Sequence, residues 1–192
     1  MVRCIAYLAR AELALQLDDK TAAVADLEAA DAVAPKEASL RLRMAFAYER
    51  LERLKSAIAQ TTLWIDSHED DARLTDAMGL RCWARALDGT DIALALKDCN
   101  AAIKSTDKSS GIFAKLAGSR GLVYLRIGDY ERSIADYDTA LRSDAKDPWS
   151  LYGRGIGKLR KHENAAGNLD IANATAIWPQ VGEQFARRGI VP

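Results

Sequence analysis

A small residue recurs along this sequence at a nearly constant interval, and this period constrains the fold more than any other feature. The small residue stands at Ala23, Ala57, Ala95, Ser133 and Gly167, at intervals of 34, 38, 38 and 34 residues. A second row follows four positions later, at Leu27, Thr61, Cys99, Tyr137 and Ile171. A third row lies three positions further on, at Ala30, Trp64, Ala102, Ala140 and Ala174. Spacings of three and four residues place the three rows on one face of a helix.

A period of this length is typical of helical hairpins that stack on one another. Each unit would consist of two antiparallel helices joined by a tight turn, and a small residue on each helix lets the two backbones approach closely. One hairpin cannot bury its own apolar face, so successive hairpins stack into a continuous core. The composition agrees, because alanine and leucine are frequent, β-branched residues are sparse and 49% of the residues are hydrophobic. The sequence therefore predicts an all-α fold.

The fourth unit carries the clearest motif, and it resembles the tetratricopeptide repeat family, whose unit has about 34 residues. The matching positions are Gly121, Tyr124, Gly128, Tyr130, Tyr137, Ala140 and Leu141, and Pro35 and Pro179 close the first and fifth units. Trp64 departs from the pattern, because a small residue is expected there. In the irregular third unit we place Cys82 opposite Ala95, with Gly79 as the competing choice. The amino-acid sequence of several units is similar to that of bacterial members of the family.

The resemblance implies a right-handed α-solenoid of about five helix-turn-helix repeats that forms a single domain over residues 1–192. We place the units at approximately 4–37, 38–74, 75–113, 114–147 and 148–181. A C-terminal capping helix is expected at 182–190, anchored by the apolar Val181 and Phe185, because a solenoid needs a cap on its last exposed face. The first unit has no such cap. Ala6, Leu13 and Leu17 are therefore expected to face the place of an earlier unit or a partner.

The charge balance excludes several classes of partner. The chain has 27 basic and 27 acidic side chains, so its formal net charge is zero, whereas binding to nucleic acid or to anionic membranes needs a basic excess. No apolar run reaches the roughly 18 residues that span a membrane, and the N-terminus lacks the apolar segment of a secretory signal. A cytoplasmic location is favoured for the chain as given, and a periplasmic location stays open if the N-terminus is truncated.

No catalytic, cofactor or metal site is expected in this sequence. The two histidines, His68 and His162, stand in polar connections without metal-ligand spacing. The glycine-rich stretch 153–158 looks like a phosphate loop, but Leu159 follows its lysine where a phosphate loop has Ser or Thr. The sequence thus predicts a protein that is not an enzyme.

Two further groups of residues are expected to be structural. Cys4, Cys82 and Cys99 form an odd set with wide spacing and are expected to be small buried residues, with an oxidisable Cys82–Cys99 pair as the alternative. Asp136 and Asp138 are expected to be surface charges rather than a catalytic pair.

In the family that this sequence resembles, the first helices of the units line a concave groove that binds peptides. The residues that we map onto this groove are Phe46, Arg50, Trp83, Leu122, Arg126, Trp149, Tyr152 and Arg160. Arg50, Arg126 and Arg160 occupy the same place in three units and are expected to form a basic row for a partner with acidic groups. Two structural alternatives remain: the arginines are solvated cations at helix C-termini, and Trp149 packs on the neighbouring hairpin. As surface residues, Arg126 and Arg160 are expected to tolerate alanine with a change in stability of about 0.5 kcal/mol or less.

The expected function is that of a non-catalytic scaffold or adaptor that binds a peptide or protein segment in its groove. One alternative is a C-terminal repeat module of a larger multidomain bacterial protein, enzymatic or associated with the cell envelope. Another alternative is a structural module that self-associates through its N-terminal edge.

Overall fold

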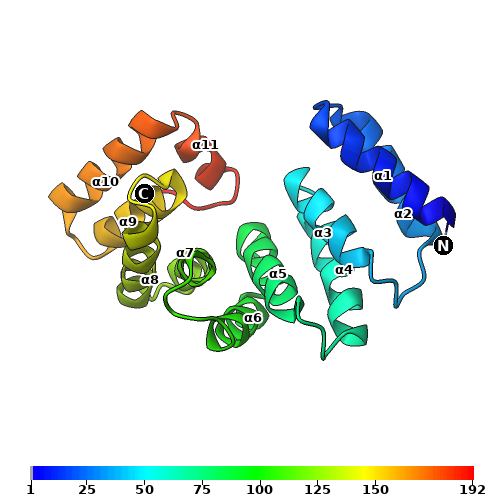
Figure 1. Ribbon diagram of the computed structural model, residues 1–192. Helices are drawn as coiled ribbons and strands as arrows, with labels where there is room; N and C mark the ends of the chain where they lie inside the picture. The colour runs from blue at the N-terminus through cyan, green and yellow to red at the C-terminus, as the bar shows by residue number, and fades with distance from the viewer. Residues whose placement is uncertain (1) are drawn as a thin grey trace. The chain divides into compact units, whose positions relative to one another are not determined.

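The computed structural model describes residues 2–192, and this range consists of helices and their connections, without a strand. The helices are α1 (Val2–Gln16), α2 (Lys20–Val33), α3 (Arg41–Arg50), α4 (Leu54–Ser67), α5 (Leu74–Asp88), α6 (Ile92–Lys104), α7 (Gly111–Ile127), α8 (Tyr130–Ser143), α9 (Pro148–Arg160), α10 (Asn164–Ile177) and α11 (Val181–Ala186) (Figure 1). The chain divides into two compact units, each larger than one of the repeats predicted above. The first extends to Ala84 and the second begins at Arg85, so α5 contributes to both. From here on, the first and second unit mean these two parts, and the repeats are called hairpins. The prediction of an all-α fold is confirmed.

The second helix of each hairpin buries the three rows that define the sequence period. These helices are α2, α4, α6, α8 and α10, and every residue of the three rows is buried in them except Ile171, which is half-buried. In the first unit α1 packs against α2 and α3 against α4, and in the second unit α7 packs against α8 and α9 against α10. The spacing of small residues therefore identified the packing face of each hairpin correctly.

The two helices of the fifth hairpin, α9 and α10, approach each other most closely where both carry glycine. A Cβ atom on Gly155 would lie 2.9 Å from the carbonyl oxygen of Gly167, and a Cβ atom on Gly167 would lie 2.9 Å from the carbonyl oxygen of Gly155. Real Cβ atoms do not approach backbone atoms so closely, so any larger residue would separate the helices. This confirms the role of both glycines as small packing residues.

Local signals explain where several helices begin. The side chains of Asp19, Ser110, Asp129 and Asp147 each accept a hydrogen bond from a backbone N–H in the first turn of the helix that follows them. Such caps satisfy donors that have no partner inside the helix. Pro148 stands in the first turn of α9, where its missing N–H costs nothing.

Four hairpin turns have a left-handed residue at the same position, directly before the N-cap of the second helix. Gly128 fills this place in the fourth hairpin with a φ of 84°, and glycine adopts such a conformation without a steric penalty. Asp18, Glu52 and His162 stand at the equivalent turns, with φ values of 56°, 56° and 63°. These three residues are therefore held in a conformation that side chains disfavour.

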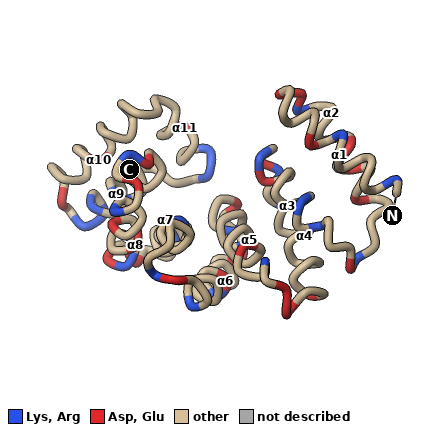
Figure 2. Tube along the Cα trace, viewed as in Figure 1, with Lys and Arg blue, Asp and Glu red and all other residues tan. Residues whose placement is uncertain are grey.

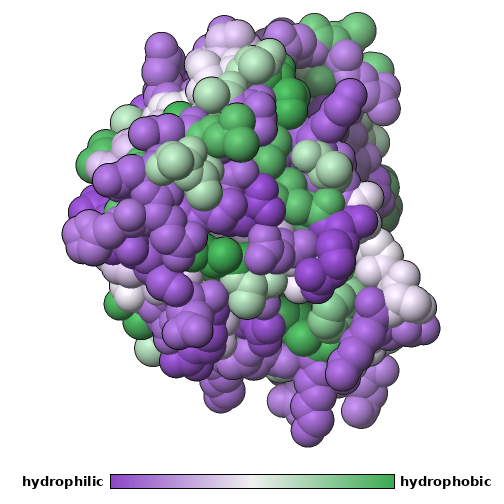
Figure 3. Space-filling model, turned by 90° about the vertical axis from the view of Figure 1, so that its left-hand side faces the viewer, coloured by the Kyte–Doolittle hydropathy of each residue, from purple (hydrophilic) through white to green (hydrophobic). Residues whose placement is uncertain are grey.

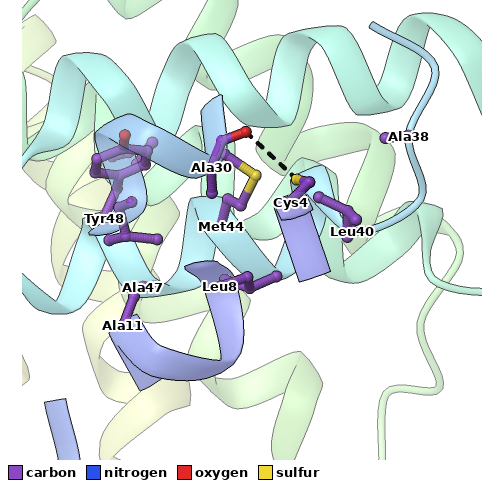
Figure 4. Close-up of a cluster of buried hydrophobic side chains, with 12 residues drawn as sticks. Cys4, Leu8, Ala11, Ala30, Ala38, Leu40, Met44, Ala47 and Tyr48 are labelled. Atoms are coloured by element: carbon purple, nitrogen blue, oxygen red, sulfur yellow. Dashed lines mark hydrogen bonds between the residues drawn. The ribbon is translucent and has the colours of Figure 1, made fainter. Parts of the chain in front are cut away.

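The core of the first unit lies between α1, α2 and α3 and combines small and large apolar side chains (Figure 4). Cys4, Leu8 and Met44 are almost completely buried there, and the Cys4 thiol donates a hydrogen bond to the carbonyl oxygen of Ala30 over 3.3 Å. Trp64, which the repeat pattern did not expect, fills a neighbouring cluster. Its indole N–H donates to the carbonyl oxygen of Ser39 at 3.1 Å, so the large ring is buried with its polar atom satisfied.

All three cysteines are buried, as expected. Cys4 is a free thiol, whereas Cys82 and Cys99 are disulfide-bonded. For those two residues the expectation of ordinary buried thiols is therefore wrong.

A buried polar residue on the second helix of each hairpin binds an arginine on the first. The polar residues are Asp26, Gln60, Asp98, Asp136 and Asp170, and their respective partners are Arg10, Arg41, Arg85, Arg120 and Arg154. Arg120 Nε and Arg154 Nε both lie 2.7 Å from a carboxylate oxygen of their partner. Asp136 is therefore a buried ion-pair partner, and the expectation that it is a surface charge is wrong.

A spacing of 16 residues between Arg and Asp signals this contact in the first, fourth and fifth hairpins. The spacing places an arginine near the middle of one helix opposite an aspartate near the middle of the next. A search of the sequence for paired charges across each hairpin would have found it.

The C-terminal helix α11 packs on α9 and α10 in the second unit. It ends at Ala186 rather than at residue 190. Gly189 has a φ of 70°, and the Ile190 N–H donates to the carbonyl oxygen of Phe185 at 3.1 Å. This hydrogen bond across a left-handed glycine closes the helix and sends residues 188–191 in a new direction.

Candidate protein-binding surface

In the first unit, the predicted groove residues Phe46 and Arg50 offer the most accessible surface. Phe46 is 44% exposed on α3, and Arg50 is exposed in the last turn of the same helix. Trp83 on α5 is half-buried, and its indole N–H donates to Glu49 Oε1 at 3.0 Å. An aromatic ring beside an arginine is a combination enriched at protein-binding hot spots.

In the second unit, two predicted groove residues are buried and offer almost no contact surface. Leu122 is 1% exposed and Tyr152 is 7% exposed. Leu122 lies in a run of five buried residues in α7, because α6, α8 and α9 all pack against this helix. Tyr152 is covered by the ring of Phe185 at a centroid distance of 4.9 Å. Their burial depends on neighbours that the repeat pattern of a single hairpin does not reveal.

Trp149 belongs to an aromatic cluster that holds the C-terminal helix. Its ring lies 4.7 Å from that of Phe185 and 6.0 Å from that of Trp178, measured between centroids. The guanidinium of Arg188 lies 5.4 Å from the Trp149 ring, a cation–π contact. The protein's own C-terminal segment therefore contacts the aromatic surface that was mapped onto the groove.

Arg126, in the last turn of α7, bonds to backbone rather than to solvent. Its Nε donates to the carbonyl oxygen of Ala86, and its Nη2 donates to those of Leu87 and Arg188 at 3.1 and 2.9 Å. Burial and then the neighbouring Arg188 lower the pKa of Arg126, but a guanidinium stays charged at neutral pH. The expectation that Arg126 is a solvated surface residue is wrong, because it ties three backbone segments of the second unit together.

Arg160, in the last turn of α9, is exposed and makes a single weaker contact. Its Nη2 donates to the carbonyl oxygen of Val191 at 3.2 Å. Arg160 therefore keeps most of its donors available for another molecule.

Arg126 and Arg160 line a pocket of about 330 Å³ in the second unit. The complete lining is Gly89, Ile92, Leu125, Arg126, Tyr130, Ile156, Arg160, Gly189, Ile190 and Val191. We call it the α7–α9 pocket. Its lining, all within the described residues, contains two guanidinium groups and no carboxylate. The pocket thus offers positive charge next to aliphatic side chains, a setting that suits an acidic group beside an apolar one.

Apolar surface is also exposed on α1 of the first unit and on α10 of the second unit. In α1, Val2, Leu13 and Leu17 are 83%, 53% and 74% exposed. In α10, Leu169 and Ile177 are 62% and 46% exposed, and Asp170 is the single charged residue of that helix, which is almost entirely tan in Figure 2. The side of the molecule on which α10 lies shows apolar patches among hydrophilic residues (Figure 3).

Residues 2–192 offer no clear metal-binding group, membrane-spanning helix or phosphate loop. Within that range, no three His, Cys, Asp or Glu side chains are grouped so that they could hold a metal ion. None of the helices described is both long and apolar enough to cross a membrane. The glycine-rich stretch 153–158 lies inside α9 and therefore does not form a phosphate loop.

Comparison with known proteins identifies the repeats. A family model described as a tetratricopeptide repeat matches residues 5–37 and 114–147. None of the curated proteins matches the chain significantly.

Two solved structures have a similar fold. The crystal structure of the MamA protein is 14% identical with a TM-score of 0.65, and the alignment covers 99% of this chain and 97% of that one. A tetratricopeptide repeat protein from Parabacteroides merdae ATCC 43184 is 15% identical with a TM-score of 0.62, and the alignment covers 98% of this chain and 75% of that one. Residues 5–37 and 114–147 are therefore matched as tetratricopeptide repeats, and the chain as a whole shares its helical fold with these two solved structures.

Proposed function

We propose that this protein is a non-catalytic adaptor that binds a segment of a partner protein. Tetratricopeptide repeats commonly mediate protein–protein interaction and are generally non-enzymatic scaffolds. The proposal assigns the main contact to the α7–α9 pocket. Phe46 and Arg50 of the first unit supply a further contact surface.

The chemistry of the α7–α9 pocket carries this proposal. The fixed Arg126 and the exposed Arg160 provide positive charge, and the half-buried Ile92 and the exposed Val191 provide apolar surface beside them. A segment with an Asp or Glu next to an aliphatic residue would pair its carboxylate with Arg160 and place its aliphatic side chain against the apolar wall. Arginine binds carboxylates with two parallel hydrogen bonds, so such a contact is strong for its size.

Arg160→Ala is the variant that tests this proposal. Purified protein serves as bait, captured partners are identified, and the affinity for a captured partner is measured by titration calorimetry. We expect Arg160→Ala to weaken binding at least tenfold, since a charged hydrogen-bonding partner at an interface contributes about 2 kcal/mol or more. Arg126→Ala is unsuitable because Arg126 also holds the fold together.

Arg142→Ala is the matched control. Arg142 is an exposed arginine in the last turn of α8, outside the α7–α9 pocket, so its removal changes the net charge by the same amount. Equal partner affinity for the native chain and Arg160→Ala, or equal losses for both variants, would contradict the assignment of the pocket.

Self-association through α1 is a second candidate function, and one observation favours it. Ala6, Ala9 and Leu13 form part of the exposed apolar face of α1. Their equivalents in α9 are Ser150, Gly153 and Gly157, which are all buried. Cβ atoms on Gly153 and Gly157 would contact Tyr137 and Ile134 of the preceding hairpin.

The same face that receives a helix in α9 is therefore uncovered in α1. Sedimentation equilibrium tests this candidate, because a self-associating chain has an apparent mass that rises with concentration. A monomer mass at all concentrations would exclude it.

A further inference from the structure

The two guanidinium groups of the α7–α9 pocket keep hydrogen-bond donors that the protein itself does not use. Arg126 places three of its five N–H donors on main-chain carbonyl oxygens, through Nε and Nη2, so the two N–H groups of Nη1 remain. Arg160 places one donor on a main-chain carbonyl oxygen, so four remain. Both side chains line the same space of about 330 Å³. Donors from two cations therefore meet in one pocket.

The positive charge of Arg126 is not neutralised by an ion pair. Its hydrogen-bond acceptors are neutral carbonyl groups, which leave the formal charge in place. Arg126 is half-buried, and the nearby positive charge of Arg188 affects it more than the negative charge of Asp88. The Asp88 carboxylate accepts a hydrogen bond from the Thr90 hydroxyl at 2.6 Å instead. A cation that is partly withdrawn from water favours the entry of an anion beside it.

A glycine keeps the free edge of Arg126 open. A Cβ atom on Gly89 would lie 3.0 Å from Nη1 of Arg126, so a larger residue at this position would cover the unused donors. Gly89 also has a φ of 80°, which other residues rarely adopt. The volume of the pocket lies within the range of about 300–1,000 Å³ that is usual for ligand sites.

The number of charges and of acceptor atoms decides which anion fits best. A carboxylate has a single charge, and one guanidinium satisfies both of its oxygens with two parallel hydrogen bonds. Arg160 alone would therefore satisfy a carboxylate, and Arg126 would stay unpaired. A phosphoryl group on a side chain carries a charge of about −1.5 to −2 at neutral pH and has three acceptor oxygens. It can accept hydrogen bonds from Arg126 Nη1, from Arg160 and from the phenol of Tyr130, which lines the same pocket.

We propose that the α7–α9 pocket binds a phosphoryl group, and that the partner segment presents it on a phosphorylated serine or threonine next to an aliphatic residue. The proposal rests on the proposed function and adds to it the identity of the acidic group. Arg126 and Arg160 bind the phosphoryl oxygens, and Ile92 and Val191 contact the aliphatic neighbour.

Three short peptides of one sequence test the inference without a known partner. They have the form acetyl-Ala-X-Leu-Ala-amide, with phosphoserine, glutamate or serine at X. Binding to the isotope-labelled intact chain is followed by heteronuclear NMR at constant ionic strength in a phosphate-free buffer, because salt screens such contacts. We expect the phosphoserine peptide to bind at least tenfold more tightly than the glutamate peptide and to shift the amide signals of Gly89 and Gly189, which line the pocket. The serine peptide should not bind measurably.

Two variants of the chain locate the contact. Arg160→Ala should weaken binding of the phosphoserine peptide at least tenfold. Arg142→Ala, which removes an exposed arginine outside the pocket, should leave the affinity unchanged. Equal affinities of the phosphoserine and glutamate peptides, unchanged signals of Gly89 and Gly189, or equal losses in the two variants would overturn the inference.

Inorganic phosphate is a further probe, which separates a phosphorylated side chain from free phosphate. Weaker binding of inorganic phosphate than of the phosphoserine peptide supports recognition of a phosphorylated segment. Equal binding of both would show that the pocket takes free phosphate, and would overturn the assignment of the phosphoryl group to the partner.

The two proposals fail in different ways. If partner capture depends on Arg160 but survives phosphatase treatment of the partner, and the glutamate peptide binds as tightly as the phosphoserine peptide, the proposed function stands and the phosphoryl site is refuted. If the phosphoserine peptide binds as expected but partner capture ignores Arg160, the pocket is a phosphoryl site and the partner binds elsewhere.

Discussion

At the residue scale, the turns of the hairpins show how one position sets both local conformation and stability. Gly128 adopts its left-handed backbone without penalty, whereas His162 holds nearly the same φ with a side chain. A left-handed conformation costs a residue with a side chain about 1–2 kcal/mol. Replacing such a residue by glycine removes this cost. Part of the resulting gain in stability is offset, because glycine loses more conformational entropy on folding.

The two turns therefore predict opposite effects of substitution. His162→Gly should raise the free energy of unfolding by about 0.5–1 kcal/mol, and Gly128→Ala should lower it by about 1 kcal/mol. Urea unfolding followed by circular dichroism measures both. Changes of the same sign in the two variants would contradict the account of the turns.

Buried aspartates predict how stability depends on pH. Burial alone would raise the pKa of Asp170, but hydrogen bonds from Arg154 and Lys158 outweigh it and lower the pKa below its usual value of about 3.9. A carboxylate with a depressed pKa stabilises the fold above about pH 4, and this contribution is lost as the pH falls further.

We expect Asp170→Asn to lower the free energy of unfolding by about 2–4 kcal/mol at pH 7, because it leaves two cations without their shared partner. The difference from the native chain should shrink between pH 4 and pH 2. Asp138→Asn is the control, since Asp138 binds the same Arg154 but is 44% exposed, and it should cost about 1 kcal/mol or less. Urea titrations from pH 7 to pH 2 measure the effect, and a constant difference across that range would disprove the linkage.

At the scale of the elements, one arginine joins parts of the second unit that lie far apart in the sequence. Arg126 extends from the last turn of α7 to the end of α5 and to Arg188, the second residue after α11. Without it, three backbone carbonyls would lose a charged donor. A hydrogen bond to a charged group contributes about 1.5–3 kcal/mol to stability. Without Arg126, these carbonyls would bind water instead, which reduces the cost of losing its hydrogen bonds.

Arg126→Ala should therefore lower the free energy of unfolding by about 1–3 kcal/mol, whereas Arg160→Ala should change it by about 0.5 kcal/mol or less. Thermal and urea unfolding compare the two variants. Hydrogen exchange of the Ile190 amide, which bonds to Phe185, should accelerate in Arg126→Ala. Equal stability of both variants would show that the Arg126 contacts carry no net energy.

At the scale of the whole molecule, the exposed apolar face of α1 predicts how the chain associates with other copies. Leu13 lies at the centre of the exposed face of α1, so Leu13→Glu should abolish any self-association without unfolding the chain. Val33→Glu is the control, because Val33 is similarly exposed, at 45% against 53%, but lies on α2. Sedimentation equilibrium should show a lower apparent mass for Leu13→Glu alone, and equal masses for both variants would place the contact elsewhere.

The candidate site was only partly predictable. Sequence reasoning selected Arg126 and Arg160 because they share a repeat position, and the structure brings both to one pocket. It also selected Leu122 and Tyr152, which are buried, since a repeat position does not tell which face a neighbouring hairpin covers. It did not select the segment 189–191, because that segment does not follow the period.

The sequence by itself determined the helices, the turns between them and the residues buried within each hairpin. These depend on contacts between residues close in the chain, so a regular spacing of small and bulky side chains records them. The tertiary structure alone decided which groove residues stay accessible. Arg126 of α7 meets carbonyls 40 and 62 residues away, and Arg160 of α9 donates to the carbonyl oxygen of Val191. Such contacts join residues of different hairpins, so the spacing of residues within one hairpin does not record them.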